Sequence, residues 1–222
     1  MPTRLVIFDL DGTLIDSLGD LADAMNVVLE DRGYQIHPRD GYRHFVGDGI
    51  EMLVRRALPT EAVGQTDIAE VVQQMRREYS TRWTATTRPY PEIPELLSEL
   101  KIRKIRSAVL SNKPDGPTRE IVGELFTEDS FAIIRGARDG VPLKPDPTSA
   151  LEIVSGLGVQ PEQSVFVGDT SIDMKTGCDA GMRTVGATWG FRDSEELLEA
   201  GADHIIDAPL QLLEILESWN VG

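Results

Sequence analysis

Two acidic residues stand at the end of the first apolar run of the chain. Residues 4–10 (RLVIFDL) are rich in branched and aromatic side chains, a pattern that predicts a buried strand. Because residues two apart on a strand project to the same face, we expect Asp9 and Asp11 to project together from its carboxyl end. Ligands bind at that edge of open α/β sheets. The pair is therefore a candidate site, although Asp11 followed by Gly12 would also suit an ordinary turn.

Further polar residues follow other apolar runs of the sequence in the same way. They are Ser111 and Asn112 after residues 107–110, Lys144 in the loop after residues 131–134, and Asp169 and Asp173 after residues 164–167. Since the carboxyl ends of parallel strands meet at one edge of a sheet, we expect four carboxylates, one lysine and one serine to converge there.

This set of side chains has a definite chemistry. Two carboxylates about 4 Å apart repel by roughly 4 kcal/mol at an intermediate dielectric, so the cluster needs a cation or a proton. Oxygen ligands without His or Cys favour a hard ion, and we expect Mg²⁺. Magnesium prefers one or two carboxylates plus a substrate phosphate, which leaves Lys144 and Ser111 to bind that phosphate. The residues therefore predict a phosphoryl-transfer site.

The rest of the sequence indicates the elements that must position these residues. Apolar runs alternate with segments of helical spacing over most of the chain, and a closing helix follows Pro209. This alternation predicts an α/β fold with a doubly wound parallel sheet. The runs predicted as strands are 4–10, 107–110, 131–134, 164–167, 183–187 and 204–206.

The alternation is interrupted after the first run. Three apolar stripes at helical spacing, within residues 18–29, 50–58 and 68–83, follow one another without a strand signal. Prolines in residues 87–94 then prevent a continuous helix, and this segment marks the second of the two hinges between the insertion and the rest of the chain. We therefore expect an inserted all-helical cap domain at residues 17–88 and a catalytic core made of residues 1–16 and 89–222.

Composition limits the classes of partner. The 222 residues include 22 Lys and Arg against 37 Asp and Glu, a net charge of −15 that disfavours nucleic acid and anionic membranes. The first apolar run is too short for a secretion signal or a membrane span. Cys178 is the one cysteine, so an intrachain disulfide is excluded, and we expect it to be a small core residue. We expect a cytoplasmic monomer or homodimer that binds a small molecule.

Taken together, the four ordered motifs resemble the haloacid dehalogenase superfamily of aspartyl-phosphate phosphatases, and the helical insertion resembles the cap of one of its subfamilies. The resemblance implies a Rossmannoid core in which Asp9 is the nucleophile and Asp11 acts first as a general acid and then as a general base. It implies metal ligands at the Asp9 carboxylate, the Asp11 main-chain carbonyl and Asp169, with Asp173 acting through water or from outside the inner ligands.

The same resemblance assigns the remaining residues of the core. Ser111 and Lys144 are expected to bind the non-bridging phosphoryl oxygens, while Gly12, Thr13 and Asn112 shape the pocket. Superfamily members that cleave carbon–halogen bonds lack the second acid of the D-x-D pair. Asp11 therefore favours cleavage of phosphate esters over cleavage of carbon–halogen bonds.

The inserted segment carries a narrower resemblance. Residues 43–58 (RHFVGDGIEMLVRRAL) and 188–191 (TWGF) are similar to phosphoglycolate phosphatases. Gly47 and Gly49 could let backbone amides approach the carboxylate of a two-carbon phospho-acid, or they simply form a turn in which Asp48 caps the next helix, with Glu51 at capping-box spacing.

This resemblance makes 2-phosphoglycolate the favoured substrate. The alternatives are another small phosphate (pyrophosphate, a nucleoside monophosphate or a sugar phosphate) and, less favoured, a receiver-type signalling module with a phosphorylated aspartate.

Overall fold

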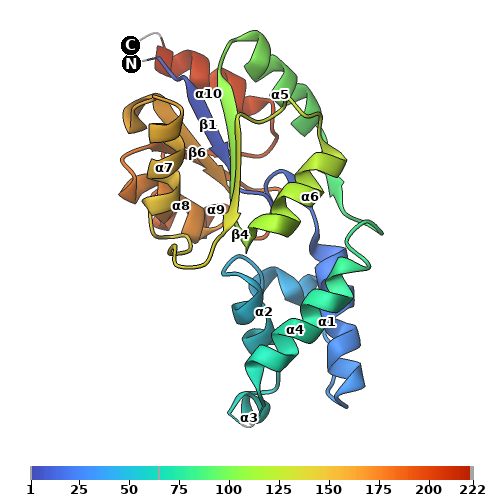
Figure 1. Cartoon of the computed structure of the whole chain (residues 1–222). Helices are drawn as coiled ribbons and strands as arrows, with labels where there is room; N and C mark the ends of the chain where they lie inside the picture. Colours follow the sequence, from blue (N-terminus) through green and yellow to red (C-terminus); the bar gives the residue numbers. More distant parts are fainter. Residues whose placement is uncertain (1, 65, 221–222) are drawn as a thin grey trace. The chain divides into compact units, whose positions relative to one another are not determined.

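The computed structural model of the chain describes residues 2–64 and 66–220. The chain forms two compact units: Met1–Leu14 with Pro89–Gly222, and Ile15–Arg88. Figure 1 follows both units along the chain, and each is described by itself below.

The first unit contains a six-stranded parallel sheet in the order β5-β4-β1-β6-β7-β8. Its strands are β1 (Leu5–Phe8), β4 (Arg106–Pro114), β5 (Ile133–Ala137), β6 (Ser164–Gly168), β7 (Arg183–Ala187) and β8 (His204–Ile206). The predicted α/β fold with a parallel sheet is confirmed. Each run predicted as a strand overlaps a strand, but β1 is shorter than predicted, β4 extends through Asn112 to Pro114, and β5 begins two residues later than predicted and ends at Ala137.

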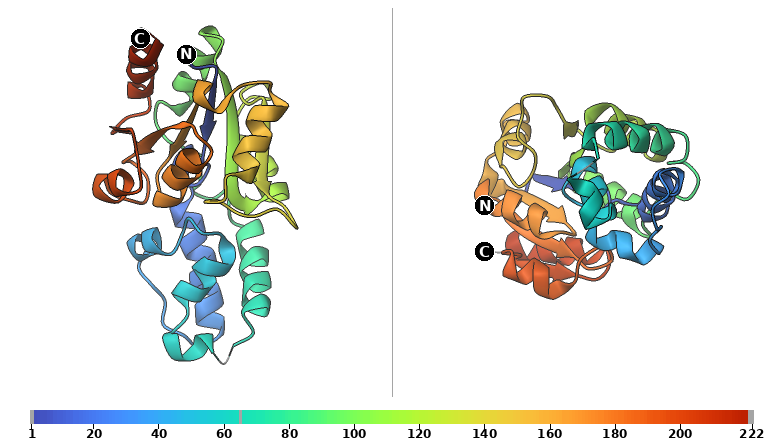
Figure 2. Two further views of the ribbon diagram at one scale, coloured as in Figure 1. Left: turned by 90° about the vertical axis from the view of Figure 1, so that its left-hand side faces the viewer. Right: turned by 90° about the horizontal axis from the view of Figure 1, so that it is seen from below.

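Helices cover both faces of this sheet, as Figures 1 and 2 show. They are α5 (Ile93–Ile102), α6 (Asp115–Leu125), α7 (Thr148–Gly156), η2 (Pro161–Gln163), α8 (Ser171–Asp179), α9 (Ser194–Glu199) and α10 (Gln211–Asn220). Leu5 and Ile7 of β1 pack with Ile153 of α7 in one core cluster. Val6 and Phe8, which point to the other face, are also buried. A strand covered on both faces must be apolar throughout, which explains the continuous run in its sequence.

Helix α8 lies between β6 and β7, where the alternation of runs predicts a helical segment, and it corrects one expectation. Its sequence, SIDMKTGCD, lacks the apolar stripe that reveals an amphipathic helix. Cys178 lies near its end with an exposed side chain, 3.4 Å from the carbonyl oxygen of Gly201. The expectation of a core cysteine was therefore wrong, because the helix turns this position away from the sheet.

The second unit is mostly helical. It contains α1 (Leu18–Asp31), η1 (Arg39–His44), α2 (Ile50–Ala57), α3 (Thr60–Val63) and α4 (Ile68–Ser80). Buried stripes of α1, including Met25 and Val28, and of α4, including Val71 and Met75, form its core. Two short strands, β2 (Ile15–Asp16) and β3 (Arg88–Pro89), pair where the chain passes between the units.

The expected capping box of α2 does not form. The N-cap residue is Gly49, with φ of 86°, and within the described residues no side chain caps the helix. Asp48 instead pairs with Arg56, and Glu51 pairs with Arg55. Because Gly49 rather than Asp48 is the N-cap residue, the two acids do not occupy the positions that a capping box requires.

No helix in the described part of the chain is long and apolar enough to span a membrane.

Candidate active site

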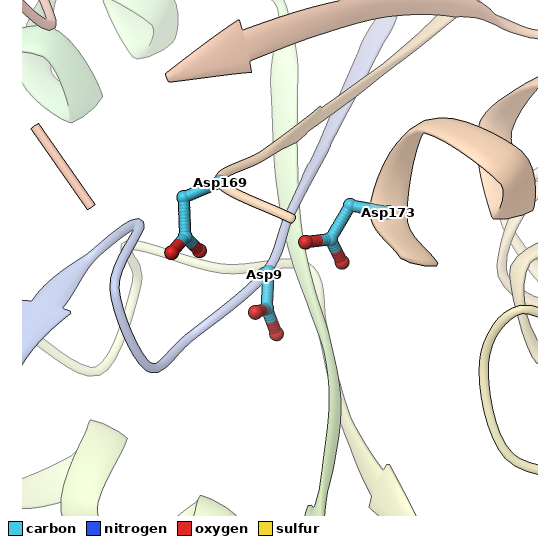
Figure 3. A group of neighbouring side chains, drawn as sticks. All are labelled: Asp9, Asp169 and Asp173. Carbon is cyan, nitrogen blue, oxygen red and sulfur yellow. The ribbon is translucent and has the colours of Figure 1, made fainter. Parts of the chain in front are cut away.

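Three aspartates gather at the carboxyl edge of the sheet (Figure 3). Asp9 follows β1, Asp169 follows β6, and Asp173 lies in the first turn of α8. Each offers one carboxylate oxygen, and these oxygens all lie within 4.8 Å of one another. Register explains the meeting of Asp9 and Asp169, because Phe8 pairs with Val167 and the amide of Asp9 donates to the Val167 carbonyl at 2.9 Å.

Neutral donors hold the carboxylate of Asp169. The Thr13 hydroxyl donates to Oδ1 at 2.9 Å, and the Phe191 amide donates to Oδ2 at 2.8 Å. Two glycines make room for this arrangement, since a Cβ added at Gly12 or Gly190 would lie 2.3 Å from an Asp169 side-chain atom. Gly12 also has φ of 92°, a conformation that side chains rarely adopt. The Asp11-Gly12 turn therefore serves to build the site.

Asp173 is fixed by its own helix start. The amide and hydroxyl of Thr170 donate to Asp173 Oδ2 at 3.1 and 2.7 Å, and the two residues form the capping box of α8. A Cβ at Gly168 would lie 2.2 Å from Asp173 Cβ, so glycine is required for the close approach. These contacts leave Oδ1 of Asp173 directed to a cation.

That cation is Lys144. Its Nζ lies 2.7 Å from Oδ1 of Asp9 and 2.7 Å from Oδ1 of Asp173, and only 3% of its side chain is exposed. The Asn112 side chain holds the Lys144 backbone from both sides, accepting from its amide at 2.9 Å and donating to its carbonyl at 3.1 Å. Asn112 thus holds the loop that carries Lys144 against the end of β4.

Burial and crowding change how these groups bind protons. Burial raises the pKa of Asp9 to about 7, with Lys144 opposing the shift and Asp173 adding to it. Burial, then Asp173 and Asp9, raise the pKa of Asp169 well above its ordinary value. Burial alone would lower the pKa of Lys144, but Asp173 and Asp9 raise it above its ordinary value. When all three carboxylates are ionised, as a bound cation would favour, they and Lys144 carry a net charge of −2, so the site suits a divalent cation with a preference for oxygen ligands.

Asp11 is not in the group of three carboxylates that could hold one ion, although its charge adds to the raised pKa of Asp9. Its Oδ1 pairs with Nζ of Lys113 at 2.7 Å, in a pair whose side chains are 18% and 8% exposed. Asp11 follows β1, and Lys113 lies in the last part of the adjacent strand β4. The D-x-D pair is therefore divided, with Asp9 in the buried triad and Asp11 beside a second lysine.

Ser111 lies buried in the last part of β4, where its hydroxyl accepts a hydrogen bond from the Lys113 amide at 3.2 Å. Gly47 belongs to the second unit, in the loop before α2, with φ of 113°. Thr13 also accepts, through its carbonyl, a hydrogen bond of 3.0 Å from the Trp189 indole. Ser111 and Thr13 thus belong to the same unit as the triad.

Sequence reasoning assigned no role to several residues of the site. Lys113 directly follows Ser111 and Asn112 in the sequence, but spacing alone did not say which acid it would meet. The capping contact of Thr170 is visible in the T-x-x-D spacing of residues 170–173. No local sequence pattern predicts the hydrogen bond from the Phe191 amide to Asp169, because Phe191 lies in a different loop.

Comparisons with known proteins agree with this geometry. A family model described as haloacid dehalogenase-like hydrolase matches residues 6–187. A phosphoglycolate phosphatase of Aquifex aeolicus is 33% identical and covers 98% of this chain and 99% of its own length. One from Psychrobacter arcticus is also 33% identical, covering 97% and 96%.

Solved structures give the same result. The crystal structure of a candidate phosphoglycolate phosphatase from Lactobacillus delbrueckii subsp. bulgaricus superimposes with a TM-score of 0.91 at 30% identity, covering 97% of this chain and 99% of that one. Family match, relatives and fold agree over nearly the whole length. The chain therefore belongs to the haloacid dehalogenase-like hydrolases, as its four motifs indicated, and it is an enzyme similar to their phosphoglycolate phosphatases.

Proposed function

We propose that this enzyme is a Mg²⁺-dependent phosphatase that hydrolyses a small phosphate monoester, 2-phosphoglycolate first among them, through an aspartyl phosphate. The observation that carries the proposal is the buried contact between Asp9 and Lys144, which places a carboxylate nucleophile beside a fixed positive charge. Relatives named phosphoglycolate phosphatase over nearly the full chain support the choice of substrate.

The donor set fits magnesium. The carboxylates of Asp9 and Asp169 and the main-chain carbonyl of Asp11 would hold the ion, while Asp173, engaged by Lys144 and Thr170, would act from outside these ligands. When bound, the ion would neutralise negative charge on the phosphoryl group and the carboxylates.

In the first half-reaction, a carboxylate oxygen of Asp9 attacks phosphorus and the bond from phosphorus to the ester oxygen breaks. The leaving alkoxide takes a proton from Asp11 and departs as an alcohol. Lys144 and Ser111 bind the non-bridging oxygens, where negative charge accumulates in the transition state.

In the second half-reaction, a water oxygen attacks the same phosphorus while Asp11 takes a proton from that water. The bond between phosphorus and Asp9 breaks, inorganic phosphate is released, and both aspartates return to their starting states. Gly12, Thr13 and Asn112 would maintain the pocket through their contacts with Asp169 and Lys144.

Selection among substrates is assigned to the second unit, Ile15–Arg88, acting as a cap. The backbone around Gly47 would contribute to binding the part of the substrate beyond its phosphate. The cytoplasmic location and the monomeric or dimeric state remain predictions.

The test is phosphate release with and without Mg²⁺ for 2-phosphoglycolate, pyrophosphate, nucleoside monophosphates and sugar phosphates, compared by kcat/KM. We expect Mg²⁺-dependent turnover with 2-phosphoglycolate preferred, and Asp9→Asn as the inactive control. A flat substrate profile would remove the phosphoglycolate assignment. Repeated turnover by Asp9→Asn would remove the covalent mechanism, and absence of phosphate release from every ester would favour a binding or signalling module.

A further inference from the structure

We propose that Lys113 is a positioning residue for Asp11, holding the carboxylate that exchanges protons with the leaving group and the water. The inference rests on the proposed function, because it assigns Lys113 a part in the same reaction. Lys113 and Asp11 form a close ion pair of 2.7 Å whose lysine side chain is only 8% exposed.

The backbone of Lys113 is built into the sheet. Its amide donates to the Ser111 hydroxyl at 3.2 Å, and its carbonyl accepts from the Thr118 hydroxyl at 3.1 Å. A Cβ added at Gly136 of β5 would lie 2.6 Å from the same carbonyl oxygen, so the neighbouring strand packs directly against it. A lysine anchored in this way has little freedom at its base, and its ammonium group can fix the position of a partner.

Successive side chains of β4 point to opposite faces of the sheet, so neighbouring residues make different contacts. Ser111 and Lys113 are two positions apart, whereas Asn112 between them holds the backbone of Lys144. Consequently β4 positions both lysines of the site. The side-chain amide of Asn112 holds the backbone of Lys144, and Lys113 is itself a residue of the strand.

The two lysines pair with different aspartates of the site. Lys144 pairs with Asp9 and Asp173, and Lys113 pairs with Asp11. A fourth ionised carboxylate among the buried aspartates would increase their mutual repulsion. By binding Oδ1 of Asp11, Lys113 holds this carboxyl group in one orientation, as a group that transfers protons requires.

Proton transfer depends steeply on position, and a misplacement of about 1 Å can lower a rate about 100-fold. Lys113→Met keeps the length of the side chain but removes its charge. It should therefore lower kcat/KM about 100-fold for esters whose leaving oxygen must be protonated. An aryl phosphate whose leaving group departs as a stable anion should lose about threefold or less, because that departure requires no acid.

Three substrates and a double mutant test the proposal in the full-length enzyme with Mg²⁺. The substrates are 2-phosphoglycolate, ethyl phosphate, which lacks the carboxylate, and p-nitrophenyl phosphate, which has a good leaving group. We expect Lys113→Met to lose about 100-fold on both alkyl esters and little on the aryl ester. Asp11→Asn should show the same selectivity, and adding Lys113→Met to it should cause no further loss.

Lys101→Met is the matched control, because Lys101 pairs with Asp129 on the surface with 63% of its side chain exposed. Thermal melts establish that each variant is folded.

Other results would overturn the proposal. A loss confined to 2-phosphoglycolate and expressed in KM would make Lys113 a ligand of the substrate carboxylate. Equal losses on all three esters, or a further loss in the double mutant, would show that Lys113 does not act through Asp11. A wild-type enzyme inactive on every ester would instead remove the proposed function and this inference with it.

Discussion

The ammonium group of Lys144 lies 2.7 Å from the carboxylate of Asp9, and both side chains are buried. The same ammonium group contacts Asp173, so one lysine compensates two of the three acids in the triad. Asp169 is held by Thr13 and the Phe191 amide, which are neutral donors. The triad therefore has more acids than lysines to compensate them, and the protein's stability should respond to pH, to metal and to loss of the lysine.

Lys144→Met should be strongly destabilising. Removing one partner of a buried ion pair leaves uncompensated charge, and we expect the free energy of unfolding to fall by about 3 kcal/mol at neutral pH. Urea unfolding in EDTA measures this change. Lys101→Met, which removes an exposed pair with Asp129, should change the free energy of unfolding much less. Equal losses in the two variants would contradict a compensating role for Lys144.

Metal binding should stabilise the folded protein. A cation that binds only the folded state at a concentration of 100 times its Kd adds about 2.7 kcal/mol to the free energy of unfolding. Titration calorimetry and thermal melts with Mg²⁺ should therefore show binding and a higher Tm. Asp169→Asn should abolish both effects, while Asp139→Asn, on an exposed residue, should preserve them. Binding retained in Asp169→Asn would place the ion elsewhere.

Without metal, stability should fall as pH rises from 5.5 to about 8. Burial raises the pKa of Asp9 to about 7 from 3.8, so the folded state keeps a proton that the unfolded chain has already released. One such group lowers the free energy of unfolding by at most about 1.4 kcal/mol per pH unit, and the loss ends above its folded pKa. Urea unfolding in EDTA across this range measures the slope.

Two controls accompany the pH experiment. Asp9→Asn should reduce the slope, because the titrating group is gone, and saturating Mg²⁺ should reduce it by favouring the ionised carboxylates. Stability that is constant or rises over this range in EDTA would refute the expected protonation of the folded state.

In the second unit, Asp20→Ala should weaken the insertion. Asp20 is 1% exposed, and its carboxylate accepts from the amides and hydroxyls of Thr86 and Thr87 at 2.6 to 3.0 Å. A Cβ at Gly19 would lie 2.7 Å from the Thr86 hydroxyl, so the contact needs glycine. Leaving these donors without their acceptor should cost about 3 kcal/mol, measurable as faster hydrogen exchange in α1 and residues 84–88.

The contribution of Asp20 should also depend on pH. Burial would raise its pKa, but the hydrogen bonds from Thr86 and Thr87 lower it below its ordinary value. This stabilisation is therefore present at neutral pH and is lost as pH falls through the folded pKa. Asp23→Ala is the matched control, since Asp23 forms an exposed pair with Arg39. Equal exchange rates in both variants would show that the Asp20 contacts do not hold the segment.

Much of the core could be predicted from local sequence. The run at β1 is apolar throughout because both faces of the strand are covered, and the stripes of α1 and α4 reveal the faces that pack together. Helix α8 has no such stripe, because its start is fixed by Thr170 and Asp173. Cys178 was misjudged for this reason, since without a stripe the sequence does not show which face of the helix is buried.

The sequence by itself determined the parallel α/β fold, the edge of the sheet that carries the site, and the types of side chain gathered there. Those properties follow from hydrophobic period and from the order of strands and loops, which are local. Only the tertiary structure decided which cation meets which acid: Lys144 with Asp9 and Asp173, Lys113 with Asp11. Those pairings depend on strand register and on loops distant in sequence, where a shift of one residue would turn each side chain to the other face.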